Sequence, residues 1–285
     1  MKHIKNKHYE GERPLFGSHD ICLENVTIHA GESALKECAN IEAVNCRFEG
    51  KYPFWHNDGF KIKNCFFTEG ARAALWYSKN LMMTDTIVEA PKMFRDMDGI
   101  RLENVQLPNA TETLWHCSNA ELKSVKIDKG DYLFMHGSDI WIEDFNLNGN
   151  YSFQYCRNIE MRNAVIHSKD AFWNTENVTV YDSILDGEYL GWHSKNLKLV
   201  NCRISGTQPL CYAEGLVMEN CLMAEDADLC FEYTTLKAAI KGSIQSVKNP
   251  SGGCICADSI GQVIIDGNCI NPNACEICAV IKKSA

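Results

Sequence analysis

An eight-residue pattern recurs along this chain in the order apolar, any, apolar, any, Asn, any, any, apolar. Examples are IEAVNCRF (41–48), FKIKNCFF (60–67) and LKLVNCRI (197–204). Successive copies are 19 to 21 residues apart. A fixed short period is typical of solenoid proteins, in which each repeat forms one coil that stacks on its neighbours. The Asn position is occupied in turn by Asn25, Asn45, Asn64, Asp85, Asn104, Ser124, Asp144, Asn163, Asp182, Asn201 and Asn220.

Within the pattern, apolar and polar residues alternate with a period of two, which is typical of a β-strand and not of a helix. Phe60 and Ile62 fall on one side of such a strand, but after the Asn the apolar positions change phase, to Cys65 and Phe67. This change predicts a corner at the Asn, because Asn and Asp tolerate left-handed backbone and bond to it locally. We expect the Asn side chains of stacked coils to form a hydrogen-bonded ladder inside this corner.

A second motif completes each repeat, after a loop rich in Gly, Pro, Ser, Asp and Asn. It occurs as PFWHNDGF (53–60), TLWHCSNA (113–120) and AFWNTENV (171–178). Three short strands and three corners leave no room for a helix in a coil of this length. The sequence therefore predicts an all-β fold, a single-stranded right-handed parallel β-helix of about 12–13 coils with 19–20 residues each. The second residue of the motif should point inward, as Phe54, Leu75, Phe94, Leu114, Phe134, Phe153 and Phe172.

The repeat extends through most of the 285 residues, so we expect one domain. We predict an N-terminal cap or arm at residues 1–20, the β-helix at residues 21–270 and a C-terminal cap at residues 271–285. A leucine-rich horseshoe has repeats of similar length, but its L-x-x-L-x-L frame does not occur in this sequence.

Composition and charge exclude several functional classes. The net charge is −9 and no run of basic residues occurs, so we expect no nucleic-acid partner. No stretch of 18 apolar residues exists, so we expect no membrane contact. The start of the chain lacks the apolar core of a secretory signal, and 15 cysteines then fit reduced thiols in the cytoplasm. Several cysteines, such as Cys46 and Cys65, occupy a slot that suits a small buried side chain.

The third and fourth residues of the second motif form two columns that combine aromatic and polar side chains. Five of the six tryptophans and four of the nine histidines fall in these columns. Aromatic rings beside hydrogen-bonding groups suit sugars, so we predict a groove for a saccharide or another small polar ligand. Two alternatives stay open, an interface with a protein (including a second copy of this chain) and structural stacking between coils. The predicted ligand-binding residues are Trp55, His56, Trp76, Tyr77, Trp115, His116, His136, Tyr155, Trp173, Trp192 and His193.

Strict alternation does not allow both columns to face solvent. If Phe54 points inward, Trp55 points outward and His56 points inward again. A buried ladder of His, Asp and Glu is costly unless it is fully hydrogen-bonded, so we expect the strand to end or bulge at the fourth column. The small residues of the fifth column should then turn inward, namely Cys38, Ser78, Cys117, Gly137, Cys156 and Ser194.

One coil departs from the pattern, because Arg95 and Asp96 stand where its neighbours have Trp and His or Tyr. Asp98 follows two residues later, about 6–7 Å away at the rise of a strand. Two carboxylates at that separation suit inverting glycoside hydrolysis, in which one is the acid and the other the base. Arg95 suits a sugar carboxylate or the base of a lyase. We therefore predict Arg95, Asp96 and Asp98 as catalytic residues, with a surface ion pair as the simpler alternative.

Two groups of residues have the chemistry of metal ligands. Asp96, His116 and His136 occupy the fourth column of three consecutive coils, and two His with a carboxylate are a common open site for zinc or iron. A hydrogen-bonded ladder without metal is the favoured interpretation, so we expect no cofactor, with a divalent metal as the alternative. A zinc site is also conceivable in the C-terminal cysteines, although they fit the inward columns of two coils as well: Cys254, Cys256, Cys269, Cys275 and Cys278.

The three-strand coil and the Asn ladder resemble the pectate-lyase-like right-handed β-helix superfamily over about residues 20–270. The length and the Trp-His motif are similar to those of an uncharacterised bacterial family within it, a domain of unknown function. This resemblance implies a saccharide groove on the face of the Trp-His motif, although fold does not imply function. We therefore predict carbohydrate binding, or a carbohydrate-active enzyme of the glycoside hydrolase or polysaccharide lyase kind. The alternative is a non-catalytic scaffold that binds protein through the aromatic face.

Overall fold

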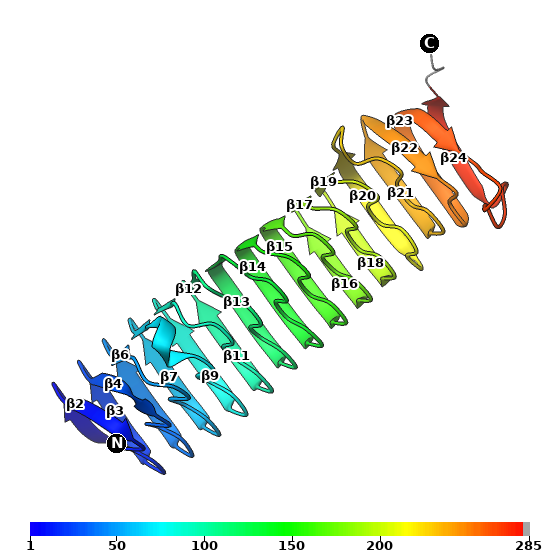
Figure 1. Cartoon of the computed structure of the whole chain (residues 1–285). Helices are drawn as coiled ribbons and strands as arrows, with labels where there is room; N and C mark the ends of the chain where they lie inside the picture. Colours follow the sequence, from blue (N-terminus) through cyan, green and yellow to red (C-terminus); the bar gives the residue numbers. More distant parts are fainter. Residues whose placement is uncertain (282–285) are drawn as a thin grey trace. The chain divides into compact units, whose positions relative to one another are not determined.

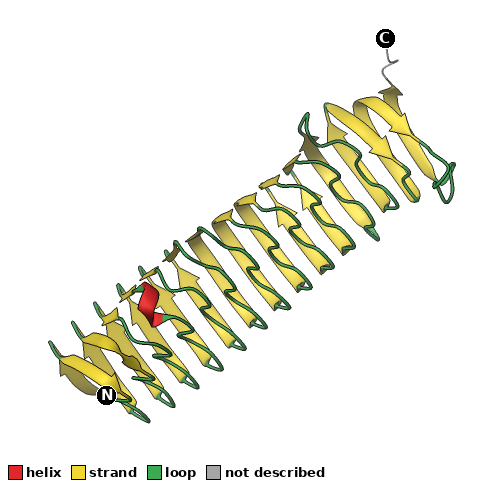
Figure 2. Ribbon diagram, in the orientation of Figure 1, coloured by secondary structure: helices red, strands yellow, loops and turns green. Residues whose placement is uncertain are grey.

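The computed structural model describes residues 1–281 and consists of short strands that pair in parallel from one coil to the next (Figure 1). It forms a parallel β-solenoid of about 15 turns, which confirms the predicted all-β solenoid. The predicted number of 12–13 coils is too small, because residues near both ends of the chain also form coils. The one helix of the described residues is a 3₁₀ turn, Glu69–Ala71 (Figure 2). Within residues 1–281 no helix has the length and apolar character that a membrane crossing requires.

The chain divides by its internal contacts into two compact units, Met1–Asn148 and Gly149–Ala285. The first unit contains β1 (Lys2–Lys5), β2 (His8–Glu12), β3 (His19–Glu24), β4 (Thr27–Glu32), β5 (Ala39–Val44), β6 (Arg47–Phe48), β7 (Asp58–Lys63), β8 (Phe66–Phe67), β9 (Lys79–Thr84), β10 (Ile87–Val88), β11 (Asp98–Glu103), β12 (Gln106–Leu107), β13 (Ser118–Ile127) and β14 (Ser138–Asn148). The described part of the second unit contains β15 (Arg157–His167), β16 (Glu176–Tyr181), β17 (Ile184–Asp186), β18 (Lys195–Val200), β19 (Arg203–Ser205), β20 (Leu216–Met223), β21 (Thr235–Lys241), β22 (Ser243–Lys248), β23 (Gly252–Ile264) and β24 (Cys275–Ile281).

Both ends of the described chain are paired. Strand β1 pairs with β3 and β2 pairs with β4, so the segment predicted as a cap or arm, residues 1–20, contains the first coil. Strand β24 pairs with β23, so the segment predicted as a C-terminal cap, residues 271–285, contributes a strand within its described part.

The core of each unit is a stack of apolar side chains from equivalent positions. In the first unit Ile41 is aligned with Phe60, and Phe60 is aligned with Leu81. These side chains are buried, and each stabilises the fold by about 1.5–3 kcal/mol through the area that it removes from water. The seven residues predicted to point inward, from Phe54 to Phe172, are all buried, which confirms this part of the pattern.

The Asn corner has the predicted left-handed backbone and register. Asn64 has a φ angle of 50°, and its side-chain amide donates to Oδ1 of Asn45 at 2.7 Å. The ladder is on the outside of the corner, however, because both side chains are exposed to solvent. The expected inward ladder is therefore wrong, since the buried side of this corner is already filled by apolar residues such as Cys65. The same bond recurs from Asn25 to Asn6, Asn104 to Asp85, Asn201 to Asp182 and Asn220 to Asn201.

The second motif of each repeat does not form the regular third strand that we expected. Positive φ angles occur at alternate residues, for example 55° at Phe94 and 51° at Asp96, and they fold the backbone into successive turns. Single parallel bridges, from Trp76 to Arg95 and from Arg95 to Trp115, keep these turns in register between coils. The side chains of the motif therefore stack from coil to coil although the backbone is not a continuous strand.

Candidate binding face

Two columns of side chains on the turn segment make up the candidate face. We define the inner row as the third-column residues and the outer row as the fourth-column residues. In the first unit the inner row is Lys36, Trp55, Trp76, Arg95, Trp115 and Met135, and the outer row is Glu37, His56, Tyr77, Asp96, His116 and His136. In the second unit the inner row includes Gln154, Trp173 and Trp192, and the outer row is Tyr155, Asn174, His193, Tyr212 and Tyr233.

The backbone bends at the outer row, which allows both rows to reach solvent. His56 has a φ angle of 57° and His116 one of 53°, so the alternation of a strand ends at these residues. Each outer-row side chain of the first unit is exposed, whereas the inner row is half-buried. The fifth-column residues that follow are buried, for example Ser78 and Cys117. The expected break in the alternation at the fourth column is therefore present, although the residues before it form turns and not a strand.

The inner row of the first unit is a continuous stack. The rings of Trp55 and Trp76 lie 5.5 Å apart between centroids at an angle of 10°. The Lys36 ammonium lies 5.8 Å from the Trp55 ring centre, on the other side. The Arg95 guanidinium lies 4.3 Å from the Trp76 ring and 4.4 Å from the Trp115 ring. The faces of these indoles are therefore largely covered by neighbouring coils, and their edges are what remains toward solvent.

The indole N–H groups are also used within the protein. A buried or half-buried Trp N–H normally finds a partner, and here the partner is a backbone carbonyl of the next coil. Neither the faces nor the N–H groups of these tryptophans are thus presented to a ligand. The bonds run from Nε1 of Trp55 to Ala73 O (2.6 Å), Trp76 to Lys92 O (2.7 Å), Trp115 to Tyr132 O (2.6 Å) and Trp192 to Gln208 O (2.7 Å).

Arg95 is held by its neighbours and does not project from the face. Its side chain is only 20% exposed, and its Nε and Nη2 atoms are buried without a hydrogen-bond partner. The carboxylate of Glu112 lies 3.6 Å from Nη2 and also pairs with Lys92 at 3.0 Å. Cation–π contacts with two indoles are the main interactions of the guanidinium. The structure thus places the predicted catalytic Arg95 in the stack, with two of its nitrogens turned away from solvent.

The outer row of the first unit presents the edges of rings and two carboxylates, those of Glu37 and Asp96. His56 and Tyr77 are stacked with their centroids 5.1 Å apart at 19°, and Tyr77 is 44% exposed. The Nδ1 atom of His116 lies 3.2 Å from Oδ1 of Asp96. The rings of His116 and His136 are 5.5 Å apart. Desolvation, together with the neighbouring His116, lowers the pKa of His136. This arrangement is a ladder of hydrogen-bonding groups with one member per coil.

The second unit repeats the arrangement. Trp173 and Trp192 lie 5.5 Å apart between centroids, and His193 stacks on Tyr212 at 4.8 Å and 21°. Tyr155 is 47% exposed. In the next coil Phe231 is buried in the core, so Glu232 takes the inner row, and Tyr233 is next to Tyr212 in the outer row.

The predicted catalytic carboxylates have separate structural roles. Asp98 begins β11 and accepts hydrogen bonds from Asn119 (2.6 Å) and Ser118 (3.0 Å). The bond from Asn119, and then that from Ser118, lowers the pKa of Asp98. The acid of a glycoside hydrolase needs a raised pKa, so Asp98 is shifted in the wrong direction for that role. Asp96 accepts from His116 in the outer row instead.

The bonds of Asp98 belong to a second polar ladder that our sequence analysis missed. An Asn or Asp at the start of the first strand of most coils bonds to the preceding coil, and most of these residues, for example Asn80 and Asn119, have left-handed backbone. The signal was present in the sequence, because an Asn precedes an apolar residue in the recurring KNL, RNI and ENV triplets. Members include the bonds from Asn40 to Asp20, Asn80 to Asp58, Asn119 to Asp98, Asn177 to Asn158 and Asn196 to Asn177.

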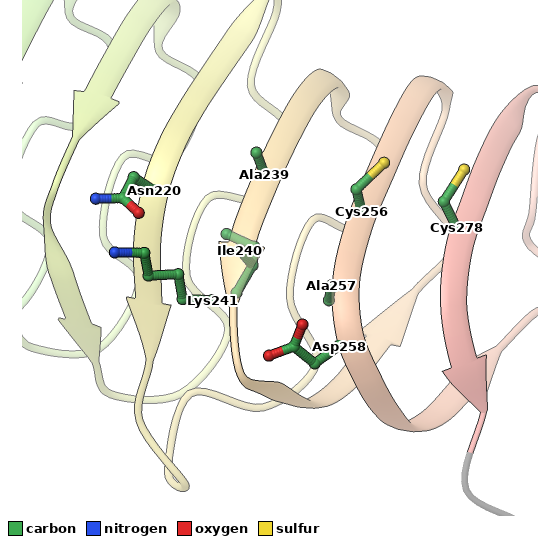
Figure 3. A pocket seen from close by; sticks show the side chains of 8 residues that line it. All are labelled: Asn220, Ala239, Ile240, Lys241, Cys256, Ala257, Asp258 and Cys278. Atoms are coloured by element: carbon green, nitrogen blue, oxygen red, sulfur yellow. The ribbon is translucent and has the colours of Figure 1, made fainter.

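Within residues 1–281, no group of three or more His, Cys, Asp and Glu side chains is arranged to hold a metal ion. Neither the predicted Asp96–His116–His136 set nor the C-terminal cysteines forms such a group. Hollows of about 400 and 490 Å³ occur in the second unit, the first lined by Lys241, Cys256 and Cys278 among others (Figure 3). None of the residues that line these two hollows belongs to the inner or outer row.

Comparison with known proteins gave a family match over nearly the whole chain. The sequence model of a family described as protein of unknown function (DUF3737) matches residues 2–278. No curated protein matches this sequence. The pentapeptide repeat protein HetL from the cyanobacterium Nostoc is 13% identical, with 80% of this chain and 87% of that chain covered and a TM-score of 0.30. The mannuronan C-5 epimerase AlgE4 A-module of Azotobacter vinelandii is 9% identical, with 99% and 88% covered and a TM-score of 0.30. A double mutant of the periplasmic alginate epimerase AlgG is 8% identical, with 99% and 73% covered and a TM-score of 0.30.

Proposed function

The chain belongs to the DUF3737 family of proteins of unknown function, and we propose that it is a non-catalytic scaffold that binds a protein partner through its outer row. The observation that carries this proposal is the stacking of the rings along the coils. Because His56 covers one face of Tyr77 and the indoles cover one another, the rings offer edges and polar atoms to a partner.

Ring edges favour a protein over a sugar as the partner. The apolar face of a sugar packs on the face of an aromatic ring, and such faces are scarce in this stack. A protein partner gains from Tyr hydroxyls, imidazole N–H groups and a carboxylate on a flat surface, since interfaces are enriched in aromatic residues and carry many hydrogen bonds. The lowered pKa of Asp98 and the internal contacts of Arg95 support a face without catalytic machinery.

A photo-crosslinking amino acid at position 77 tests the proposal in the cells that make the protein. The matched control places the same amino acid at Ile87, which is 38% exposed in β10 of the same unit and outside both rows. We expect a crosslinked protein band from position 77 that position 87 does not give, and that His56→Ala weakens. Equal bands from both positions, or no band from position 77, would reject the proposed interface.

A saccharide held only by hydrogen bonds is the second candidate function. The pair of Asp96 and His116 favours it, because a carboxylate and an imidazole side by side suit the vicinal hydroxyls of a sugar. A glycan array followed by calorimetry tests this candidate. We expect Asp96→Asn to abolish binding and Glu121→Gln, which changes a carboxylate outside both rows whose side chain is 42% exposed, to retain it. Absence of glycan binding by the unmodified protein would reject the candidate.

A further inference from the structure

Cys256 and Cys278 are direct partners on the last two strands of the described chain. Strand β24 pairs in parallel with β23, and Cys256 is aligned with Cys278 in the register. Adjacent strands are about 4.8 Å apart, which is within the range of Cα separations that a disulfide spans. Figure 3 shows the two side chains on neighbouring strands with their sulfur atoms on the same side.

The two thiols are neighbours and are accessible. The register of β23 and β24 places the side chains of Cys256 and Cys278 next to each other, and both residues are exposed. They line one end of the hollow of about 400 Å³, together with Lys241 and Asp258. A small disulfide or another small electrophile in solution can therefore reach either sulfur atom.

Exposure distinguishes this pair from two similar pairs in the core. Cys46 and Cys65 stack on consecutive coils, where the backbone N–H of Cys46 donates to Sγ of Cys65 at 3.3 Å. Cys202 and Cys221 are neighbours in the same way, and the Cys221 side chain raises the pKa of Cys202. All four of these residues are buried. The geometry of stacked thiols thus recurs in this chain, but solvent reaches the pair in β23 and β24.

We propose that Cys256 and Cys278 are a redox-active dithiol that closes into a disulfide between β23 and β24 when it meets a small-molecule disulfide such as oxidised glutathione. The thiolate of one cysteine attacks a sulfur of the small disulfide, breaks its S–S bond and releases one small thiol. The second cysteine then attacks the resulting mixed disulfide, forms the protein S–S bond and releases the second small thiol. The protein loses two electrons and two protons, which the small disulfide takes up as it becomes two thiols.

The neighbours of the pair indicate the order of attack. The neighbouring Cys256 side chain has the largest of the effects that raise the pKa of Cys278 to about 11. A high pKa lowers the fraction of reactive thiolate, so Cys256 should attack first and Cys278 should close the bond.

The proposed disulfide would hold β24, a strand of the second unit that, in the described chain, has a strand partner on one edge only. Within residues 1–281, β24 pairs with β23 alone, so one edge of β24 has no strand partner there. Terminal elements with few contacts open first in folded proteins. A covalent bond from β24 to β23 would therefore suppress the local opening of this strand.

Oxidation of the full-length protein with oxidised glutathione tests the proposal. We expect the mass of the folded protein to fall by two hydrogen atoms and peptide mapping to find one bond, from Cys256 to Cys278. Hydrogen exchange of the β24 amides should slow in the oxidised protein. The thiols of Cys46, Cys65, Cys202 and Cys221 should remain unmodified under the same conditions.

Three variants separate the proposed pair from its neighbours. Cys278→Ser should stop at a glutathione adduct on Cys256, and Cys256→Ser should form no bond to Cys278. Cys254→Ser is the matched control, because Cys254 is aligned with Glu276 and should not affect the bond. A bond from Cys254 or Cys275, or complete oxidation of the exposed thiols without any internal bond, would overturn the proposal. The internal bond and its absence can both be detected in the unmodified protein. Neither outcome depends on whether the outer row binds a protein partner.

Discussion

The guanidinium carbon of Arg95 lies 4.3 Å from the ring centre of Trp76, on the face that points toward the next coil. The other face of the guanidinium meets Trp115. The sequence analysis predicts Arg95 as a catalytic residue, with a surface ion pair as the alternative. The contact with Trp76 gives Arg95 a structural role as well, because a stacked and largely buried side chain contributes to the fold.

We predict that Arg95→Ala lowers the free energy of unfolding by about 1–2 kcal/mol, since it removes two cation–π contacts and the packing of the side chain. Arg95→Lys should recover only part of this loss, because an ammonium is not planar. Urea denaturation measures the change. Arg101→Ala, whose side chain is 45% exposed, is the control and should change stability by less than about 0.5 kcal/mol. Equal effects of the two alanine variants would show that the stack is energetically unimportant.

Two substitutions of Asn64 separate the contribution of its left-handed backbone to stability from that of its side-chain hydrogen bond to Asn45. Asn64→Ala should destabilise the protein by about 1–2 kcal/mol, because Ala is disfavoured at a φ angle of 50° and cannot donate to Asn45. Asn64→Gly keeps the left-handed backbone at little cost and loses only the side-chain bond. We therefore expect the Gly variant to be the more stable of the two in chemical denaturation. The opposite order would mean that the left-handed backbone is not what selects Asn here.

Cysteine reactivity should follow burial. Ten cysteines are buried and five are not, namely Cys254, Cys256, Cys269, Cys275 and Cys278. Burial raises the pKa of Cys38 to about 11 and that of Cys211 to about 12, so their thiolates are scarce near neutral pH. A thiol reagent should label at most five groups rapidly in the native protein and all fifteen in denaturant. Rapid labelling of more than five groups would contradict the described packing.

Acid should remove a stabilising contribution at Asp186. Hydrogen bonds from Ser205 and then His167 lower the pKa of this carboxyl below its ordinary value of 3.8. Because the folded pKa is below the unfolded one, the contribution is complete above the unfolded pKa and is lost as the pH falls through the folded pKa. The free energy of unfolding of the unmodified protein should therefore fall more steeply below about pH 4 than that of Asp186→Asn. Asp226→Asn, which changes an exposed carboxylate without these bonds, should retain the steep fall.

The sequence by itself determined the solenoid and its inward residues. A period of two within each strand and of about 20 between coils fixes which side chains can be buried together, and Phe54, Phe60 and Cys65 are buried as that pattern requires. It also determined that the backbone must bend at His56, because alternation would otherwise bury a polar column.

Only the tertiary structure decided how the side chains of neighbouring coils contact one another. The sequence places Trp76 and Arg95 in one column, but it does not show that the guanidinium covers the indole and that the indole N–H bonds to Lys92 O. The order of residues along one coil is a local property, and the orientation of a ring depends on residues about 20 positions away in the next coil. For the same reason the ladder at Asn64 proved to be exposed, and the partnership of Cys256 with Cys278 appears only in the register of β23 and β24.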